Sequence, residues 1–209
     1  SAASDVYKRQ LMYLFDIGWF EHLLLALLLT YLEKSRYPLR NKVMLLFSFK
    51  AGLRAKEIAA VTWSMVCNAD GKIGTEINLT NNASKGNYSG RIIPLNKQLK
   101  NLLERLLLQK QEKLGFCLEN HIIDSERGRK TSPQAIVNWF SKLYKTVGID
   151  GCSSHSGRRT FITNAAKNIC LVGGSLNDVR LLAGHASLAT TQRYIEYNTE
   201  AHKRVVELV

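Results

Sequence analysis

Two side chains near the C-terminal end of the sequence are suited to nucleophilic chemistry. His185 and Tyr194 lie nine residues apart, and a tyrosine hydroxyl activated by neighbouring groups is a candidate nucleophile. Gly184 follows an apolar run and is typical of a helix end, and Ser187 is a good N-cap for a second short helix that carries Tyr194. The spacing predicts that His185 lies in a tight corner between two helices.

Further candidates lie upstream, at the start of two other predicted helices. Arg54 opens a helix after Gly52, and Glu57 follows one turn later on the same face, where the two can pair. His155 and Arg158 are three residues apart at the start of another helix. The N-terminus of a helix is the positive end of its dipole, so a phosphate can bind beside this pair.

Apolar spacing predicts the helices that must hold these residues. Residues 40–51 read as a buried helix that ends at Gly52. A stripe of leucines from 95 to 107 predicts a second helix with one side on the core. A third is punctuated by Ser132 as N-cap, with proline in its first turn and Gly148 after its end.

Between the first two of these helices, the pattern alternates with period two and contains turn residues. We expect short strands at residues 63–67, 72–79 and 91–94. Lys85 falls in the polar loop 80–90, at the tip of a hairpin. The predicted fold class is α+β and mainly helical, with helices around a core and one small three-stranded antiparallel β-sheet.

The composition points to a polyanionic partner. The chain has 29 Lys and Arg against 17 Asp and Glu, a formal charge of +12, and nucleic acid is the commonest partner of such an excess. A basic protein with solvated lysines is the alternative that charge alone leaves open. The four cysteines are scattered without a C-x-x-C pair, and no nucleotide-binding or zinc-protease motif occurs. We therefore expect no metal and no cofactor.

Residues 1–29 do not share this regular pattern. The first ten show no periodicity and are interpreted as a scar of cloning or gene assignment. The rest are apolar, but Asp16 and Glu21 interrupt the run before it reaches the roughly 20 apolar residues of a membrane span. We expect a leader or linker remnant here in preference to a membrane helix, followed by one domain over residues 30–209.

Taken in order, the candidates resemble the active-site set of the tyrosine recombinases, the phage integrase family. That set comprises Arg54, Lys85, His155, Arg158, His185 and Tyr194. The sequence segments around these residues resemble the family's motifs as well. They are Gly52-Leu-Arg-Ala-Lys-Glu57, Ser84-Lys-Gly with Arg91-Ile-Ile-Pro-Leu95, His155-Ser-Gly-Arg-Arg-Thr-Phe161, and Leu182-Ala-Gly-His-Ala-Ser-Leu-Ala-Thr-Thr-Gln-Arg-Tyr194. The resemblance covers roughly residues 30–200.

The resemblance implies a role for each residue of the set. Tyr194 attacks a DNA phosphate and forms a 3′-phosphotyrosyl link, without ATP or metal. The two arginines hold the non-bridging phosphate oxygens through forked guanidinium groups, and His185 adds a hydrogen bond. His155 supports the nucleophile's proton transfer, and Lys85 protonates the leaving 5′-oxygen.

Other residues have supporting roles in this scheme. Glu57 orients the site. Arg91 and Arg159 are candidate contacts to the DNA backbone, and Lys72 is a weak competitor for the role of Lys85.

The resemblance also implies partners and an organisation. We expect double-stranded DNA as partner, a cytoplasmic and nucleoid-associated location, and a homo-oligomer, a tetramer on DNA, held by a C-terminal tail from about residue 195. Packing of this tail on its own domain is equally compatible with its small apolar face. The family's usual N-terminal clamping domain does not fit into residues 1–29, so we expect a catalytic domain alone or a truncated product.

Three functions remain open at this point. The first is a site-specific recombinase or integrase of a mobile element. The second is type IB topoisomerase-like DNA relaxation with the same site. The third is a non-catalytic DNA-binding remnant.

Overall fold

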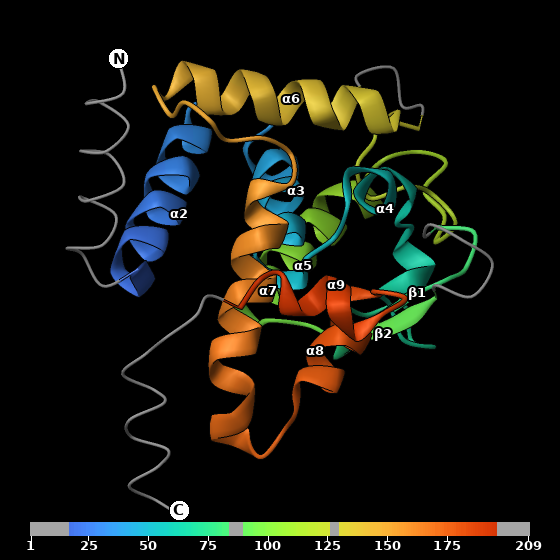
Figure 1. Cartoon of the computed structure of the whole chain (residues 1–209). Helices are drawn as coiled ribbons and strands as arrows, with labels where there is room; N and C mark the ends of the chain where they lie inside the picture. The colour runs from blue at the N-terminus through green and yellow to red at the C-terminus, as the bar shows by residue number, and fades with distance from the viewer. Residues whose placement is uncertain (1–16, 84–89, 126–129, 196–209) are drawn as a thin grey trace, which may run out of the picture.

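The computed structural model describes residues 17–83, 90–125 and 130–195 (Figure 1). Its elements are α2 (Ile17–Glu33), α3 (Pro38–Ala51), α4 (Ala55–Ala60), the 3₁₀ helix η1 (Trp63–Met65), β1 (Glu76–Leu79), β2 (Arg91–Pro94), α5 (Lys97–Gln111), α6 (Pro133–Thr146), α7 (Ser156–Asn168), the 3₁₀ helix η2 (Ile169–Val172), α8 (Leu176–Ala183) and α9 (Leu188–Gln192). The mainly helical α+β fold is confirmed.

Helix α3 is the centre of the core. It packs against α5, α7 and α2, and ten of its fourteen residues are buried. The largest buried side chains of the core include Trp63, Phe47, Phe140 and Tyr144. Figure 1 shows α6 across one end of the molecule, with α8, α9 and the small sheet gathered below it. A separate small apolar cluster joins α7 to α8 through Ile162, Val179 and Ala183.

The predicted helix ends are reproduced where capping is local. Ser132, the predicted cap, accepts a hydrogen bond from the backbone N–H of Ala135 at the start of α6. Asn96, which was not predicted as a cap, accepts from the backbone N–H of Gln98 at the start of α5. Gly52 ends α3 with a φ of +62°, a left-handed conformation that glycine adopts at low cost.

Helix α2 corrects the expectation that residues 1–29 lie outside the domain. Leu25, Leu28 and Leu32 are buried at helical spacing and belong to the main core, while Leu23 and Leu27 are exposed. The hydrophobic effect favours burial of the apolar stripe against α3. Residues 17–29 therefore belong to the domain, and residues 1–16 lie outside the described part of the chain. Among the described helices, none is long and apolar enough to cross a membrane.

The expected three-stranded sheet is wrong by one strand. In the described residues, β1 and β2 pair antiparallel, with Ile77 opposite Ile93. The segment expected as a further strand instead forms η1, because the backbone N–H groups of Trp63 and Ser64 donate to carbonyls of Asn120 and Leu118. The predicted hairpin turn still forms, but it closes only one isolated bridge, between Cys67 and Ile73.

Candidate active site

The site is built first at the junction of α3 and α4. A Cβ on Gly52 would collide with the ring of Phe161 on α7, so a glycine lets these helices approach closely. The chain then turns, and Arg54 becomes the N-cap residue of α4. Glu57, one turn later, is fully buried. The predicted pairing of Arg54 with Glu57 is present, with Nη1 to Oε1 at 2.9 Å.

Glu57 is the acceptor for two arginines. Its carboxylate accepts from the backbone N–H of Arg54 at 2.8 Å, and from Nη1 and Nη2 of Arg91 at 2.9 and 3.1 Å. Burial alone would raise the pKa of Glu57, but the bonds from Arg91 and Arg54 outweigh it and hold the pKa below its usual value. Glu57 is therefore ionised at neutral pH.

Arg91 occupies a different place from the one expected. The sequence suggested a contact to the DNA backbone, but this side chain is only 7% exposed. Besides the bidentate pair with Glu57, its Nε donates to the carbonyl of Leu182 at 2.8 Å. Arg91 is the first residue of β2, so it ties the strand that follows the Lys85 loop to the end of α8. The hydrogen bonds of Arg91 described here are therefore made within the protein.

Arg158 enters the site from the first turn of α7. Gly157 lies against Phe49 and Ser48 of α3, and this close approach buries Arg158 to 3% exposure. Its Nη1 donates to the carbonyl of Gly52 and its Nη2 to that of Ala183, the latter at 2.6 Å. Burial, and then repulsion from Arg54, lowers the pKa of Arg158 to about 10, so the guanidinium is charged at neutral pH.

His185 lies in the predicted corner between α8 and α9. Gly184 ends α8 with a φ of +60°, and the His185 ring is buried with Nδ1 at 2.9 Å from the hydroxyl of Thr191. Burial lowers its pKa to about 4, with further contributions from Arg158, Arg54 and Arg91. The imidazole is neutral at pH 7. When Thr191 donates to Nδ1, Nε2 carries the proton and can donate to a phosphate oxygen.

Tyr194 lies directly against this histidine. The two rings stack with centroids 5.6 Å apart and planes 24° apart. Tyr194 follows the end of α9 and does not lie within it, and its backbone N–H donates to the carbonyl of Thr191 at 3.0 Å. The tyrosine also packs against the small apolar cluster between α7 and α8. The candidate nucleophile is therefore next to the residues predicted to hold phosphate.

Three consecutive carbonyls at the end of α8 gather the arginines. Arg91 bonds the carbonyl of Leu182, Arg158 that of Ala183, and Arg54 that of Gly184. The last carbonyls of a helix lack intrahelical partners and carry the negative end of its dipole. The end of α8 therefore collects three cations from three separate segments of the chain and fixes them around His185.

The remaining predicted residues are placed differently. His155 is the N-cap residue of α7, and its side chain is exposed, as is that of Arg159. Lys72 is exposed at the end of the 68–71 turn. Lys85 lies outside the described residues. Arg91 was named from the sequence, but its pairing with Glu57 was missed, and no local pattern indicates it because the partners are 34 positions apart.

Three arginines meet at the end of α8, beside a neutral histidine and a tyrosine. This arrangement, on a mainly helical α+β domain, is suited to holding a phosphate diester next to a tyrosine hydroxyl. Residues 19–201 match the phage integrase family. The chain belongs to this family.

Individual relatives agree with this assignment. Tyrosine recombinase XerD of Halalkalibacterium halodurans is 30% identical over 163 residues, which cover 77% of this chain and 50% of the relative. Tyrosine recombinase XerC of Rickettsia prowazekii is 30% identical over 161 residues, covering 76% of this chain and 47% of the relative. The chain thus spans about half the length of the curated relatives it matches.

A solved structure shows the same fold. The catalytic domain of bacteriophage HP1 integrase has a TM-score of 0.56 at 20% identity, with 88% of this chain and 89% of that chain covered. The Tn1549 transposon integrase, in complex with a circular intermediate DNA, has a TM-score of 0.68 at 16% identity, with 87% and 63% covered.

Proposed function

We propose that this chain is the catalytic part of a site-specific DNA recombinase or integrase, in which Tyr194 cleaves and rejoins DNA strands. The observation that carries the proposal is the convergence of Arg54, Arg158 and His185 at the end of α8, with Tyr194 stacked on the histidine. The names of the relatives, tyrosine recombinases and integrases, support it.

The proposed reaction starts with a DNA phosphate bound beside Arg54. This side chain is 23% exposed, and its guanidinium carries N–H groups beyond those bonded to Glu57 and Gly184. The buried Arg158 adds positive charge beside the phosphate, and the neutral His185 donates a hydrogen bond to a phosphate oxygen. Charge that develops on the phosphate oxygens is thereby stabilised by groups that are already in place.

The Tyr194 oxygen then attacks phosphorus, and its phenolic proton passes to His155 or water. The bond from phosphorus to the 5′-oxygen breaks, and Lys85 gives that oxygen a proton. The covalent 3′-phosphotyrosyl link keeps the energy of the broken bond, so a 5′-hydroxyl can reverse the step without ATP. We propose that no metal takes part.

The first prediction tests Tyr194 as the nucleophile. A library of nicked duplexes with randomised sequence is incubated with the protein in a chelator, and covalent adducts are separated on denaturing gels. We expect adducts with the wild type and none with Tyr194→Phe, because the phenylalanine lacks the attacking oxygen. Tyr31→Phe, at an exposed tyrosine on α2, is the matched control and should retain adduct formation.

The outcomes separate the three functions. An adduct that persists in Tyr194→Phe removes this residue from the role, and loss of adduct in the chelator contradicts metal independence. Relaxation of supercoiled plasmid without exchange between duplexes favours the topoisomerase-like function. DNA binding without any adduct favours the non-catalytic remnant.

We also propose that the active form is a homo-oligomer on DNA, held by the tail that follows residue 195, which lies outside the described residues. A chain ending at residue 195 is expected to bind DNA as a monomer. Light scattering of both lengths on one duplex measures this.

A further inference from the structure

Two adjoining hollows lie away from the Tyr194 site, at the other end of α3. The first has a volume of about 590 Å³ and lies between the start of α3, the end of α5 and residues 124 and 125. The second, of about 290 Å³, extends it toward Lys130. The two share Lys110, Lys113 and Asp124 as lining residues. Together they form one continuous surface, which we call the basic hollow.

The lining of the first hollow is strongly positive. Six basic side chains face two acidic ones there. Both carboxylates are already paired, Glu33 with Lys42 and Asp124 with Lys110. Arg105 on α5 and Lys113, which follows the end of α5, are exposed, and neither forms an ion pair with another described residue. The lining therefore holds four more basic than acidic side chains, and Arg105 and Lys113 present their charges to solvent.

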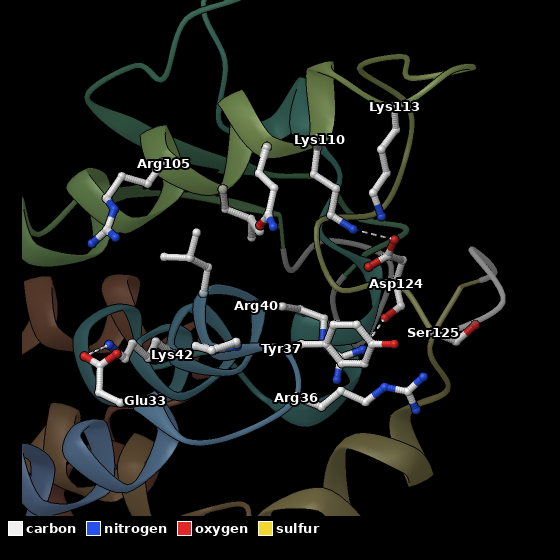
Figure 2. A pocket seen from close by; sticks show the side chains of 14 residues that line it. Glu33, Arg36, Tyr37, Arg40, Lys42, Arg105, Lys110, Lys113, Asp124 and Ser125 are labelled. Carbon is white, nitrogen blue, oxygen red and sulfur yellow. Dashed lines mark hydrogen bonds and ion pairs between the residues drawn. The ribbon is translucent and has the colours of Figure 1, made fainter.

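The opposite wall holds two arginines in defined positions. Arg36 and Arg40 lie over the ring of Tyr37, with guanidinium carbons 5.2 and 4.6 Å from its centroid. Arg40 also donates to the carbonyl of Asp124 at 2.9 Å. Figure 2 shows Arg105, Lys110 and Lys113 on one side of the hollow, across from Tyr37, Arg36 and Arg40. Cations on facing walls match an anion that lies between them.

The lining of the second hollow is basic as well. It adds His121 and Lys130 to the lining. Burial lowers the pKa of His121, and the charge of Lys130 lowers it further. A positive surface that runs through two hollows fits an extended polyanion better than a single small ion.

The basic hollow lies at a defined separation from the proposed reaction. Pro38 of its lining begins α3, and Gly52 at the other end of α3 accepts from Arg158. A helix of 14 residues is about 20 Å long. Successive phosphates of one strand are about 3.4 Å apart along the duplex axis, so a duplex that runs along α3 covers this span in about six base pairs.

We infer that the duplex runs along α3 and that the basic hollow binds its phosphate backbone about six base pairs from the phosphate that Tyr194 attacks. This inference rests on the proposed function, because it takes DNA as the partner. It assigns Arg105 and Lys113 to affinity for flanking DNA and not to the chemical step.

The test uses the full chain with two charges removed. Arg105→Gln/Lys113→Gln is compared with Lys97→Gln/Lys167→Gln, two exposed lysines outside both hollows. Affinity for a duplex with long flanks is measured by fluorescence anisotropy over a range of salt. Each lost phosphate contact lowers the slope of log affinity against log salt by about 0.9. We expect the hollow variant to lose about two units of slope and the control to keep the wild-type slope.

A second arm varies the DNA. On duplexes that end within about four base pairs of the nick, we expect the hollow variant and the wild type to bind equally, because the flanking phosphates are absent. Wild-type slope in the hollow variant, or an equal loss in the control variant, would overturn the inference. So would a variant that binds inorganic phosphate more weakly but keeps the DNA slope, since that result describes a small-anion site.

Adduct formation separates this inference from the proposed function. At saturating protein on a nicked duplex, Arg105→Gln/Lys113→Gln should form the Tyr194 adduct within about twofold of wild type. Loss of the adduct in this variant contradicts the assignment to binding. Absence of the adduct in the wild type contradicts the proposed function, whatever the salt slopes show.

Discussion

At the scale of single residues, the site is an excess of buried positive charge around one carboxylate. Arg54 and Arg91 pair with Glu57, while Arg158 donates to the backbone carbonyls of Gly52 and Ala183. Burial is the main cause of the lowered pKa of Arg158 and of His185, and repulsion from the neighbouring arginines lowers both pKa values further. An entering phosphate relieves that repulsion, so we regard the arrangement as prepared for an anion.

His185 carries a pH prediction at this scale. Its pKa is about 4 in the folded protein and about 6.5 in an unfolded chain. Above pH 6.5 the histidine is neutral in both states and adds no pH dependence. Between pH 6.5 and 4 the unfolded state binds the proton first, so the free energy of unfolding falls as the pH falls.

The measurement is urea unfolding of the wild type and His185→Asn at pH 7 and pH 5. Asparagine does not titrate, so the variant should lose less stability over this interval, by on the order of 1 kcal/mol after solvent screening. His121 and the carboxylates titrate in both proteins and cancel in the comparison. Equal losses would show that burial and the arginines do not hold His185 neutral in the folded protein.

At the scale of elements, the end of α8 organises the site. Its last carbonyls accept from β2, α7 and the N-cap of α4, so one short helix sets the relative positions of three distant segments. Gly184 allows this in two ways. Its φ of +60° turns the chain toward His185, and its missing Cβ leaves room for the Arg91 guanidinium, whose Nη1 would lie 2.7 Å from that atom.

Gly184→Ala tests this organisation. We expect a loss of about 2 kcal/mol in the free energy of unfolding and a loss of about tenfold or more in adduct formation, because Arg91 must move. Gly173→Ala is the matched control, with a φ of +77° and no atom within 4 Å of its added Cβ. It should share the backbone cost, about 1 kcal/mol, and keep wild-type adduct formation. Equal adduct losses in both variants would place the effect in backbone strain.

At the scale of the whole molecule, α2 packs against α3 and adds its leucines to the main core. Its sequence is apolar on more than one face, and the structure buries only the stripe that includes Leu25, Leu28 and Leu32. The domain therefore starts earlier than the regular pattern from residue 30 suggested.

Adjacent leucines on α2 test this boundary. Leu28 is fully buried and Leu27 is 51% exposed. Leu28→Ala should lower the free energy of unfolding by about 2–4 kcal/mol, because it removes buried methyl groups and leaves a cavity. Leu27→Ala should change it by less than about 0.5 kcal/mol. Thermal or urea unfolding measures both, and equal small effects would mean that α2 does not contribute to the folded domain in solution.

The sequence by itself determined the features that depend on neighbouring residues. The caps at Ser132 and Gly52 and the corner at His185 were predicted, because a capping bond or a left-handed glycine involves residues within about one helical turn. The order of the motifs also indicated the family. Periodicity placed the helices for the same reason, since their apolar stripes repeat locally.

Only the tertiary structure decided the features that depend on distant partners. Arg91 became an internal clamp because Glu57 and Leu182 accept its bonds across 34 and 91 positions. The strand expected at residues 63–67 became η1 because the backbone N–H groups of Trp63 and Ser64 donate to carbonyls of the 118–120 segment. Helix α2 joined the domain because α3 covers its leucines. Such hydrogen bonds and contacts have no local periodicity, so they appear only when the chain is folded.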